Sequence, residues 1–426
     1  MIAGHIFTGF GFGPIQGGLF AKEAFQSGNF SRIAVAEIDA DLVDAVRANN
    51  GSYYVNIAKS DGIETIQIDN VKLLNPNAIA DRQSLLEVIA QSTEIVTSLP
   101  SVTFYGAGRA NGVVSLIAEG LKKSSVEATI IYTAENNNHA AEILEKAVGE
   151  KITTLPQKKV QFLNTVIGKM SRVVTDPAEI TELKLRTITP DIERALLVEQ
   201  FNRILVSKTQ IVGFKPGIKV FIEKDNLLPF EEAKLYGHNA IHSLLGFIGA
   251  VKGAMSMTEL KDNRIVMQIG RDAFLKESGA ALIKKYAYLE DELFTENSFK
   301  EYAENLLKRI TNPYLDDTIG RVTRDIVRKL EIDGRIFGTM QLAMEYGIKP
   351  KNMALGAMAG IALLLKKAEE NNLPNDLRCC NWRTLNENQI EKILNWLWAD
   401  KNCKQINHIV KSLKSSIKQL EELAKN

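Results

Sequence analysis

A lysine, two histidines and an asparagine recur at short intervals between residues 230 and 246. Lys234, His238 and His242 follow one another at four-residue steps, and Asn239 comes directly after His238. In an α-helix such a step returns to the same face, so the first three side chains are expected side by side, with Asn239 at the edge. The neighbouring residues are largely apolar. Polar groups in that setting are costly unless they meet one another or a polar ligand.

Three interpretations of this helix stay open on chemistry alone. The polar side chains can form a buried structural network. Alternatively, His238 and His242 bind a metal ion with a third ligand. That ligand would have to be an otherwise unmarked carboxylate, because the chain has only five histidines and its cysteines are distant. In the third interpretation the helix transfers a proton, with Lys234 as acid and base while Asn239 and His242 hold a substrate oxygen.

A glycine-rich turn over residues 8–18 follows the first expected strand. Glycine spacing of this kind lets the backbone approach a pyrophosphate, whose charge then faces the unpaired N–H groups of the next helix. The candidate cofactor-binding residues of the turn are Gly11, Gly13, Ile15 and Gln16. Gln16 occupies the place of the third glycine, and Gly17 and Gly18 can supply the close helix packing instead. The turn predicts a dinucleotide site, the alternative being a glycine-rich turn without a ligand.

Glu37 ends the second expected strand, about 20 residues after the glycine turn. A carboxylate at this place can accept hydrogen bonds from both hydroxyl groups of the adenosine ribose. The next basic residue is Arg47, so no neighbour in the sequence is ready to hold a 2′-phosphate. NAD is therefore favoured over NADP as the cofactor. A solvated strand end is the alternative interpretation of Glu37.

Short β-branched runs alternate with helical patterns in the first half, as is typical of a parallel sheet covered by helices. The expected strands lie at 2–8, 33–38, 94–98, 128–133 and 160–163. The second half has mostly helical spacing, with expected helices that include 229–252 and 316–330. The sequence predicts an α/β, Rossmann-type doubly wound domain over residues 1–222 and a mostly α-helical domain over residues 223–426.

Composition excludes several classes of protein. The chain balances 52 basic against 51 acidic residues, so nothing in its net charge points to nucleic acid or an anionic membrane. The longest apolar run, 353–365, is too short to span a bilayer. Cys379, Cys380 and Cys403 cannot form a disulfide framework, and no export signal is visible. We expect a cytoplasmic protein with a small-molecule substrate, either a monomer or a small homo-oligomer.

Several segments resemble one family in the same order. Residues 10–15 resemble its F-G-x-G-x-I loop, and residues 234–242 its K-x-x-x-x-N-x-x-H signature. Residues 199–210 are similar to its E-x-F-x-x-W-x-V-D-x-x-Q segment, although Ile204 and Ser207 replace the tryptophan and aspartate. Residues 310–335 follow its R-F-x-N-P…D…R-V-x-R-D-x-x-R-K-L block. The family is that of the zinc-independent, long-chain polyol dehydrogenases, which includes mannitol 2-dehydrogenase, mannitol-1-phosphate 5-dehydrogenase and the hexuronate reductases.

The resemblance implies a metal-independent, NAD-dependent oxidoreductase acting on CH–OH groups. Its substrate would be a polyol, or a polyol phosphate such as mannitol 1-phosphate, and its product the ketose. A hexuronate reductase is the alternative, and a non-catalytic nucleotide-binding protein a more distant one. The implied catalytic residues are Lys234 as general acid and base, Asn239, His242, and Asn164 after the last sheet strand. The nicotinamide half of the cofactor is expected near Thr97, Glu135 and Asn136, which end the later strands.

A basic cluster on the expected helix over residues 316–330 consists of Arg321, Arg324, Arg328 and Lys329. Such a cluster can bind a substrate phosphate, with arginine forming bidentate contacts. His238 is a further candidate substrate contact. Salt bridges from the basic cluster to nearby aspartates, Asp316, Asp317 and Asp325, are an equally supported alternative.

Overall fold

The structure, a computed structural model, describes residues 4–106, 109–152, 159–399 and 401–425. The chain forms two compact units, Met1–Phe230 and Glu231–Asn426. The domain boundary expected at residue 222 lies inside the strand Phe221–Lys224, before the division between the units.

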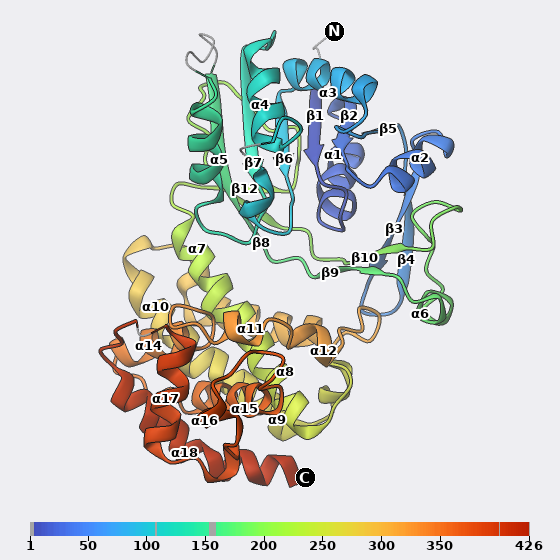
Figure 1. The fold of residues 1–426 in the computed structure, drawn as a ribbon. Coiled ribbons are helices and arrows are strands. Elements are labelled where there is room, and N and C mark those ends of the chain that lie inside the picture. The colour runs from blue at the N-terminus through green and yellow to red at the C-terminus, as the bar shows by residue number, and fades with distance from the viewer. Residues whose placement is uncertain (1–3, 107–108, 153–158, 400, 426) are drawn as a thin grey trace. The chain divides into compact units, whose positions relative to one another are not determined.

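An eight-stranded sheet forms the centre of the first unit (Figure 1). Its strands, in spatial order, are β12 (Phe221–Lys224), β11 (Ile204–Ser207), β8 (Lys159–Ile167), β7 (Ala128–Thr133), β6 (Glu94–Thr97), β1 (His5–Phe10), β2 (Phe30–Ala36) and β5 (Val71–Leu74). All neighbours are parallel except β8 and β11. In register, Phe7 of β1 lies between Ile33 of β2 and Glu94 of β6. Residues 2 and 3 of the first expected strand lie outside the described residues.

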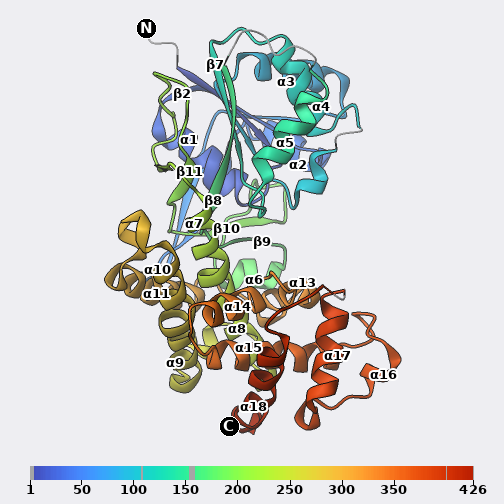
Figure 2. The same ribbon diagram turned by 90° about the vertical axis from the view of Figure 1, so that its left-hand side faces the viewer.

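Helices cover both faces of this sheet, which confirms the Rossmann-type doubly wound fold (Figure 2). The helices of the first unit are α1 (Lys22–Ser27), α2 (Ala40–Ala48), α3 (Ile79–Gln91), α4 (Val113–Lys122), α5 (Ala140–Gly149) and α6 (Pro177–Glu182). Apolar residues of α3, α4 and α5 form the core on one face. Those of α1 and α2 form the core on the other.

A second sheet, which the sequence did not predict, has the strand order β4 (Ile63–Ile68), β3 (Tyr53–Ala58), β10 (Ala195–Glu199) and β9 (Ser171–Val174). β10 is buried along its whole length and packs against the helical segment that follows the glycine turn. A Cβ atom on Gly18 would lie 2.5 Å from Val198 Cγ1, and one on Gly17 would lie 3.0 Å from Leu196 Cδ1. Both glycines therefore supply close helix packing, as the sequence predicts.

The second unit is mostly helical, as predicted. The division between the units falls within α7 (Leu228–Glu232). The helices that follow are α8 (Ala240–Lys252), α9 (Arg264–Asp272), α10 (Ala280–Tyr286), α11 (Glu296–Ile310), α12 (Ile319–Val322), α13 (Ile326–Lys329), α14 (Phe337–Glu345), α15 (Lys351–Lys366), α16 (Asn375–Arg378), α17 (Glu387–Leu397) and α18 (Ile406–Lys425). The apolar run 353–365 is buried within α15, which packs against α8 and α18. None of the helices in the described part of the chain is long and apolar enough to cross a membrane.

The single helix expected over residues 316–330 is wrong. Two short helices, α12 and α13, occupy this segment, and Asp325 between them has a left-handed backbone with φ of 54°. Apolar spacing does not reveal such a break, because the residues on each side keep helical periodicity.

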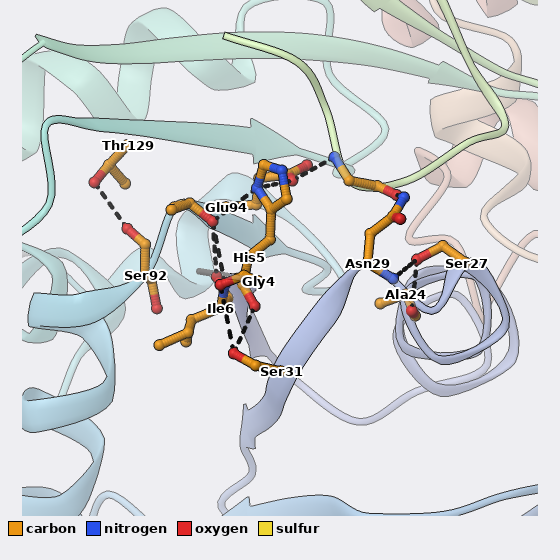
Figure 3. Close-up of polar contacts among 12 residues, drawn as sticks. Gly4, His5, Ile6, Ala24, Ser27, Asn29, Ser31, Ser92, Glu94 and Thr129 are labelled. Atoms are coloured by element: carbon orange, nitrogen blue, oxygen red, sulfur yellow. Dashed lines mark hydrogen bonds and ion pairs between the residues drawn. The ribbon is translucent and has the colours of Figure 1, made fainter. Parts of the chain in front are cut away.

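A buried acidic group lies at the amino ends of β1 and β6 (Figure 3). The Glu94 side chain is fully buried, and its Oε1 atom accepts a hydrogen bond of 2.7 Å from the Gly217 N–H. His5 Nδ1 lies 3.2 Å from the same oxygen. Burial raises the pKa of Glu94 to about 7. This end of the sheet is opposite to the carboxyl ends of the strands, where dinucleotides bind in folds of this kind.

Candidate active site

Lys234 lies in a π-helical segment, Ala233–Asn239, that runs without interruption from α7 into α8. Such segments widen the helix and are frequent at functional sites. The Tyr236 carbonyl accepts hydrogen bonds from two side chains of other elements, Ser278 Oγ at 2.7 Å and Thr339 Oγ1 at 3.2 Å. In a π-helix the hydrogen bonds run from residue i to i+5, so Asn239 lies about one turn beyond Lys234.

The electrostatic setting of Lys234 favours a neutral amine. The side chain is partly buried, and loss of hydration lowers its pKa to about 8. The positive charge of Arg335 lowers the pKa further, whereas Glu231 opposes the shift. A lysine with a pKa near neutrality can accept and return a proton under physiological conditions.

His238 is buried, with 5% of its surface exposed. Its Nδ1 atom has no hydrogen-bond partner among the described residues. Burial, followed by the positive charge of Arg309, holds the pKa of His238 well below its usual range, and so the imidazole is neutral. A buried polar atom without a partner costs about 1–3 kcal/mol, so a ligand group that satisfies it gains binding energy.

His242 lies on α8 next to a buried carboxylate. Its Nε2 atom is 3.2 Å from Oδ2 of Asp317, although the ring is not oriented for a linear hydrogen bond. Asp317 is 2% exposed and receives two hydrogen bonds from Arg321, of 2.6 Å from Nε and 2.9 Å from Nη2. Although burial alone would raise it, the pKa of Asp317 falls to about 2 because His242 and Arg321 stabilise the carboxylate.

The basic cluster does not lie on one helix, because Arg321 is in α12 whereas Arg328 and Lys329 are in α13. Arg321 is paired with Asp317, and Arg328 lies 3.3 Å from Asp325, so both make the salt bridges of the alternative interpretation. Lys329 is buried and donates to the Arg324 carbonyl. Burial lowers the pKa of Lys329 to about 8, with Arg335 as the next cause. The structure thus gives three of the four expected phosphate contacts, Arg321, Arg328 and Lys329, partners within the protein.

The glycine turn has the geometry that a pyrophosphate requires. Gly11 has φ of 79°, and a Cβ atom there would lie 3.0 Å from the Ser98 carbonyl oxygen. No heavy atom lies within 4 Å of a Cβ built on Gly13, so the backbone of the turn faces open space at this point. Ile15 is partly buried, and Gln16 is fully buried with neither amide atom bonded among the described residues. The residues of the turn fit a dinucleotide.

Glu37 directly follows β2, and its side chain accepts a hydrogen bond from the backbone of the glycine turn. Its Oε2 atom accepts a 2.6 Å hydrogen bond from the Phe12 N–H, while Oε1 accepts from Ile38 and Asp39. Asp39 in turn pairs with Arg194 at 2.8 Å. Sequence reasoning missed Arg194, because it comes from a segment 155 positions further along the chain.

Glu135 holds the ends of the later strands together. It is buried and accepts hydrogen bonds from Thr97 Oγ1 at 2.9 Å, from the Leu99 N–H at 2.9 Å and from the Tyr105 hydroxyl at 2.7 Å. Asn136, the next residue, is exposed. The structure thus brings Thr97 and Glu135 into direct contact.

Asn164 lies within β8 rather than after it, opposite Thr133 of β7. Its Oδ1 atom accepts from the Ala141 N–H at 2.9 Å, and its Nδ2 atom donates to Glu142 Oε2 at 2.9 Å. Both ends of the amide are thus bonded at the start of α5. The strand extends further than its β-branched residues indicate, which is why the expected position was wrong.

Asp317 and Arg335 were also missed as site residues, although the four-residue spacing of Asp317 and Arg321 is a visible signal of a pair. Among the residues that the structure describes, no three His, Cys, Asp or Glu side chains are arranged to hold a metal ion.

A Rossmann-type unit followed by a helical unit with this lysine–asparagine–histidine set defines a two-domain dehydrogenase. The model of the mannitol dehydrogenase Rossmann domain matches residues 6–220, and that of the mannitol dehydrogenase C-terminal domain matches residues 226–421. The chain belongs to the mannitol dehydrogenase family and is an oxidoreductase that acts on CH–OH groups.

Individual relatives agree with this assignment. The chain is 27% identical over 358 residues to the mannitol-1-phosphate 5-dehydrogenase of Buchnera aphidicola subsp. Acyrthosiphon pisum (strain Tuc7), covering 82% of this chain and 84% of that one. Among solved structures, a substrate-free D-sorbitol dehydrogenase has a TM-score of 0.76 at 14% identity, over 99% of this chain and 94% of that one. The mannitol 2-dehydrogenase of Pseudomonas fluorescens, solved with NAD and D-mannitol, has a TM-score of 0.70 at 16% identity, over 100% and 94%. These two structures share the fold.

Proposed function

We propose that this chain is an NAD-dependent dehydrogenase that interconverts a polyol phosphate, such as mannitol 1-phosphate, and its ketose. One observation carries the proposal: Lys234, the lysine of the family signature, is partly buried with its pKa lowered to about 8. The likeness to a mannitol-1-phosphate 5-dehydrogenase supports the choice of substrate class.

Lys234 performs the proton transfer in this mechanism. When bound, NAD supplies the acceptor for the hydride that leaves the carbinol carbon. The neutral Lys234 Nζ takes the proton of the same hydroxyl group, and the ammonium form returns a proton to the carbonyl oxygen in the reverse direction. The low pKa makes both forms available near neutral pH.

Asn239 and His242 orient the reacting oxygen. The Asn239 amide donates a hydrogen bond to the oxygen as negative charge develops on it, in the manner of an oxyanion hole. His242 fixes the same hydroxyl group or its neighbour. The role of Asn164 as a second amide donor stays a prediction, and it requires exchange of the bond from Nδ2 to Glu142.

The charges around the catalytic helix favour an anionic substrate. Arg309 and Arg335 are both close enough to His238 to lower its pKa. One buried acid of the region, Asp317, is paired with Arg321. A phosphate placed here is attracted by the positive charges of Arg309 and Arg335, and the buried Nδ1 of His238 offers a bond to a substrate hydroxyl.

For the cofactor, we propose NAD over NADP. Glu37 keeps a carboxylate at the end of β2, where a ribose diol binds and a 2′-phosphate is repelled. The charge of Arg194, the basic group nearest Asp39, is compensated by that aspartate. Thr97, Glu135 and Asn136 stay predicted contacts of the nicotinamide half, with buried Glu135 acting by fixing Thr97.

The test is a substrate panel followed by NADH absorbance, run with NAD and with NADP. It includes sugar alcohols, their phosphates and hexuronates. The proposal predicts the highest kcat/KM for a polyol phosphate with NAD. Preference for a hexuronate would assign the same chemistry to a substrate carboxylate. NAD binding without turnover on any member of the panel would overturn the enzymatic assignment to these substrates. Gel filtration and cell fractionation test the expected small assembly and cytoplasmic location.

A further inference from the structure

We infer that Asp317 is a positioning residue that fixes the orientation and the proton of His242, and that Arg321 serves this pair rather than a substrate phosphate. The inference rests on the proposed role of His242 in holding the substrate oxygen.

The backbone around Asp317 is held in place independently of its side chain. The Asp317 carbonyl accepts a 2.8 Å hydrogen bond from the Met257 N–H, and the Ile319 N–H donates to the Met255 carbonyl at 2.9 Å. Thr318 caps α12 through a 3.2 Å hydrogen bond from the Arg321 N–H. The backbone hydrogen bonds of Asp317 and Ile319 therefore fix the position from which the carboxylate extends.

Asp317 reaches His242 because α12, the helix that begins two residues later, packs closely on α8. Gly246 lies one helical turn after His242, on the same face. A Cβ atom on Gly246 would lie 2.4 Å from Val322 Cγ1, so only glycine permits this approach. The packing brings Asp317 Oδ2 to 3.2 Å from His242 Nε2, although 75 positions of sequence separate the two residues.

The chemical consequence is a choice between the two imidazole nitrogens. A carboxylate beside Nε2 favours the proton on that nitrogen, which leaves Nδ1 as the acceptor for a substrate hydroxyl. The two hydrogen bonds from Arg321 hold the Asp317 carboxylate in place beside His242.

A substitution series separates positioning from simple support of the fold. We expect Asp317→Asn to lower kcat by about 10- to 100-fold, the range found when carboxylates behind metal-binding histidines are removed. The dissociation constant of NADH, measured by fluorescence, should be unchanged. Asp325→Asn is the matched control, because the Asp325–Arg328 pair is exposed and Asn tolerates the left-handed backbone of this position. Its kcat should equal that of the unsubstituted enzyme.

The decisive measurement is a double-mutant cycle with His242→Ala. If Asp317 acts through His242, then Asp317→Asn lowers kcat much less in the His242→Ala background than in the wild type. Equal losses in both backgrounds would overturn the inference. Because an unpaired Arg321 can destabilise the fold, Asp317→Asn/Arg321→Gln is measured as well. Wild-type kcat in that folded double variant would also refute a positioning role. Full activity of His242→Ala alone would instead remove the proposed role of His242.

Discussion

The pH dependence of turnover tests the central role of Lys234. With a pKa of about 8, about a quarter of the Lys234 side chains are neutral at pH 7.5, against about one in a thousand at the ordinary value of 10.5. The lowered pKa therefore increases the concentration of the base by about 200-fold. For polyol oxidation we expect kcat/KM to rise tenfold per pH unit and to level near pH 8. Ketose reduction, which needs the ammonium, should decline above the same pH.

Substitutions of Lys234 complete this prediction. Lys234→Ala should lower kcat by about 10²- to 10⁴-fold, the usual contribution of a general acid or base, without changing NADH binding. Lys234→Arg should be similarly impaired in oxidation, because a guanidinium does not lose its proton at these pH values. The control is Lys276→Ala, since this exposed lysine pairs only with Asp272 among the described contacts. A pH profile without an inflection between 6 and 9, or near-normal turnover in Lys234→Ala, would refute the reasoning.

Three further predictions concern other parts of the chain. Gly13→Val should weaken NADH binding by at least about tenfold with an unchanged Tm, because its side chain enters the open space of the glycine turn; Gly62→Ala, also in open space, is the control. His238→Leu should raise the substrate KM while Tm stays equal or rises, because a buried unpaired nitrogen is removed; a lower Tm with an unchanged KM would contradict this. Glu94 has a pKa of about 7 in the fold against about 4.5 unfolded, so the protonated form is favoured by folding, and stability is lost as pH rises through this window. The free energy of unfolding, measured by urea titration, should fall by up to about 3 kcal/mol between pH 5 and 8, and it should fall less in Glu94→Gln. Identical pH profiles of this free energy in the wild type and in Glu94→Gln would contradict the assignment.

Much of the first unit could be predicted because its signals are local. The strands β1, β2, β6 and β7 each contain a run of buried, largely apolar residues, as expected for a sheet covered on both faces. The four-stranded sheet was missed because its strands come from two distant parts of the chain and several are short or partly exposed. In the same way, the extent of β8 beyond residue 163 is set by pairing with β11, which no local pattern encodes.

For the candidate site, too, the local spacing of residues could be predicted from the sequence, whereas their tertiary contacts could not. The spacing of Lys234, Asn239 and His242 is visible in the sequence, but the π-helical segment that changes their angular relation is stabilised by Ser278 and Thr339 from other helices. The basic cluster was predicted on one helix, and the break at Asp325 divides it between two short helices.

By itself the sequence determined the class of fold and the glycine turn, and it predicts the helix of the proposed proton transfer, because periodicity and backbone freedom act over a few neighbouring residues. Only the tertiary structure decided which groups surround that helix. Asp317 reaches His242 and Arg335 affects Lys234 through packing between segments far apart in the chain. Charge and burial depend on those distances in space, and so the pKa values on which the chemistry depends are properties of the folded molecule.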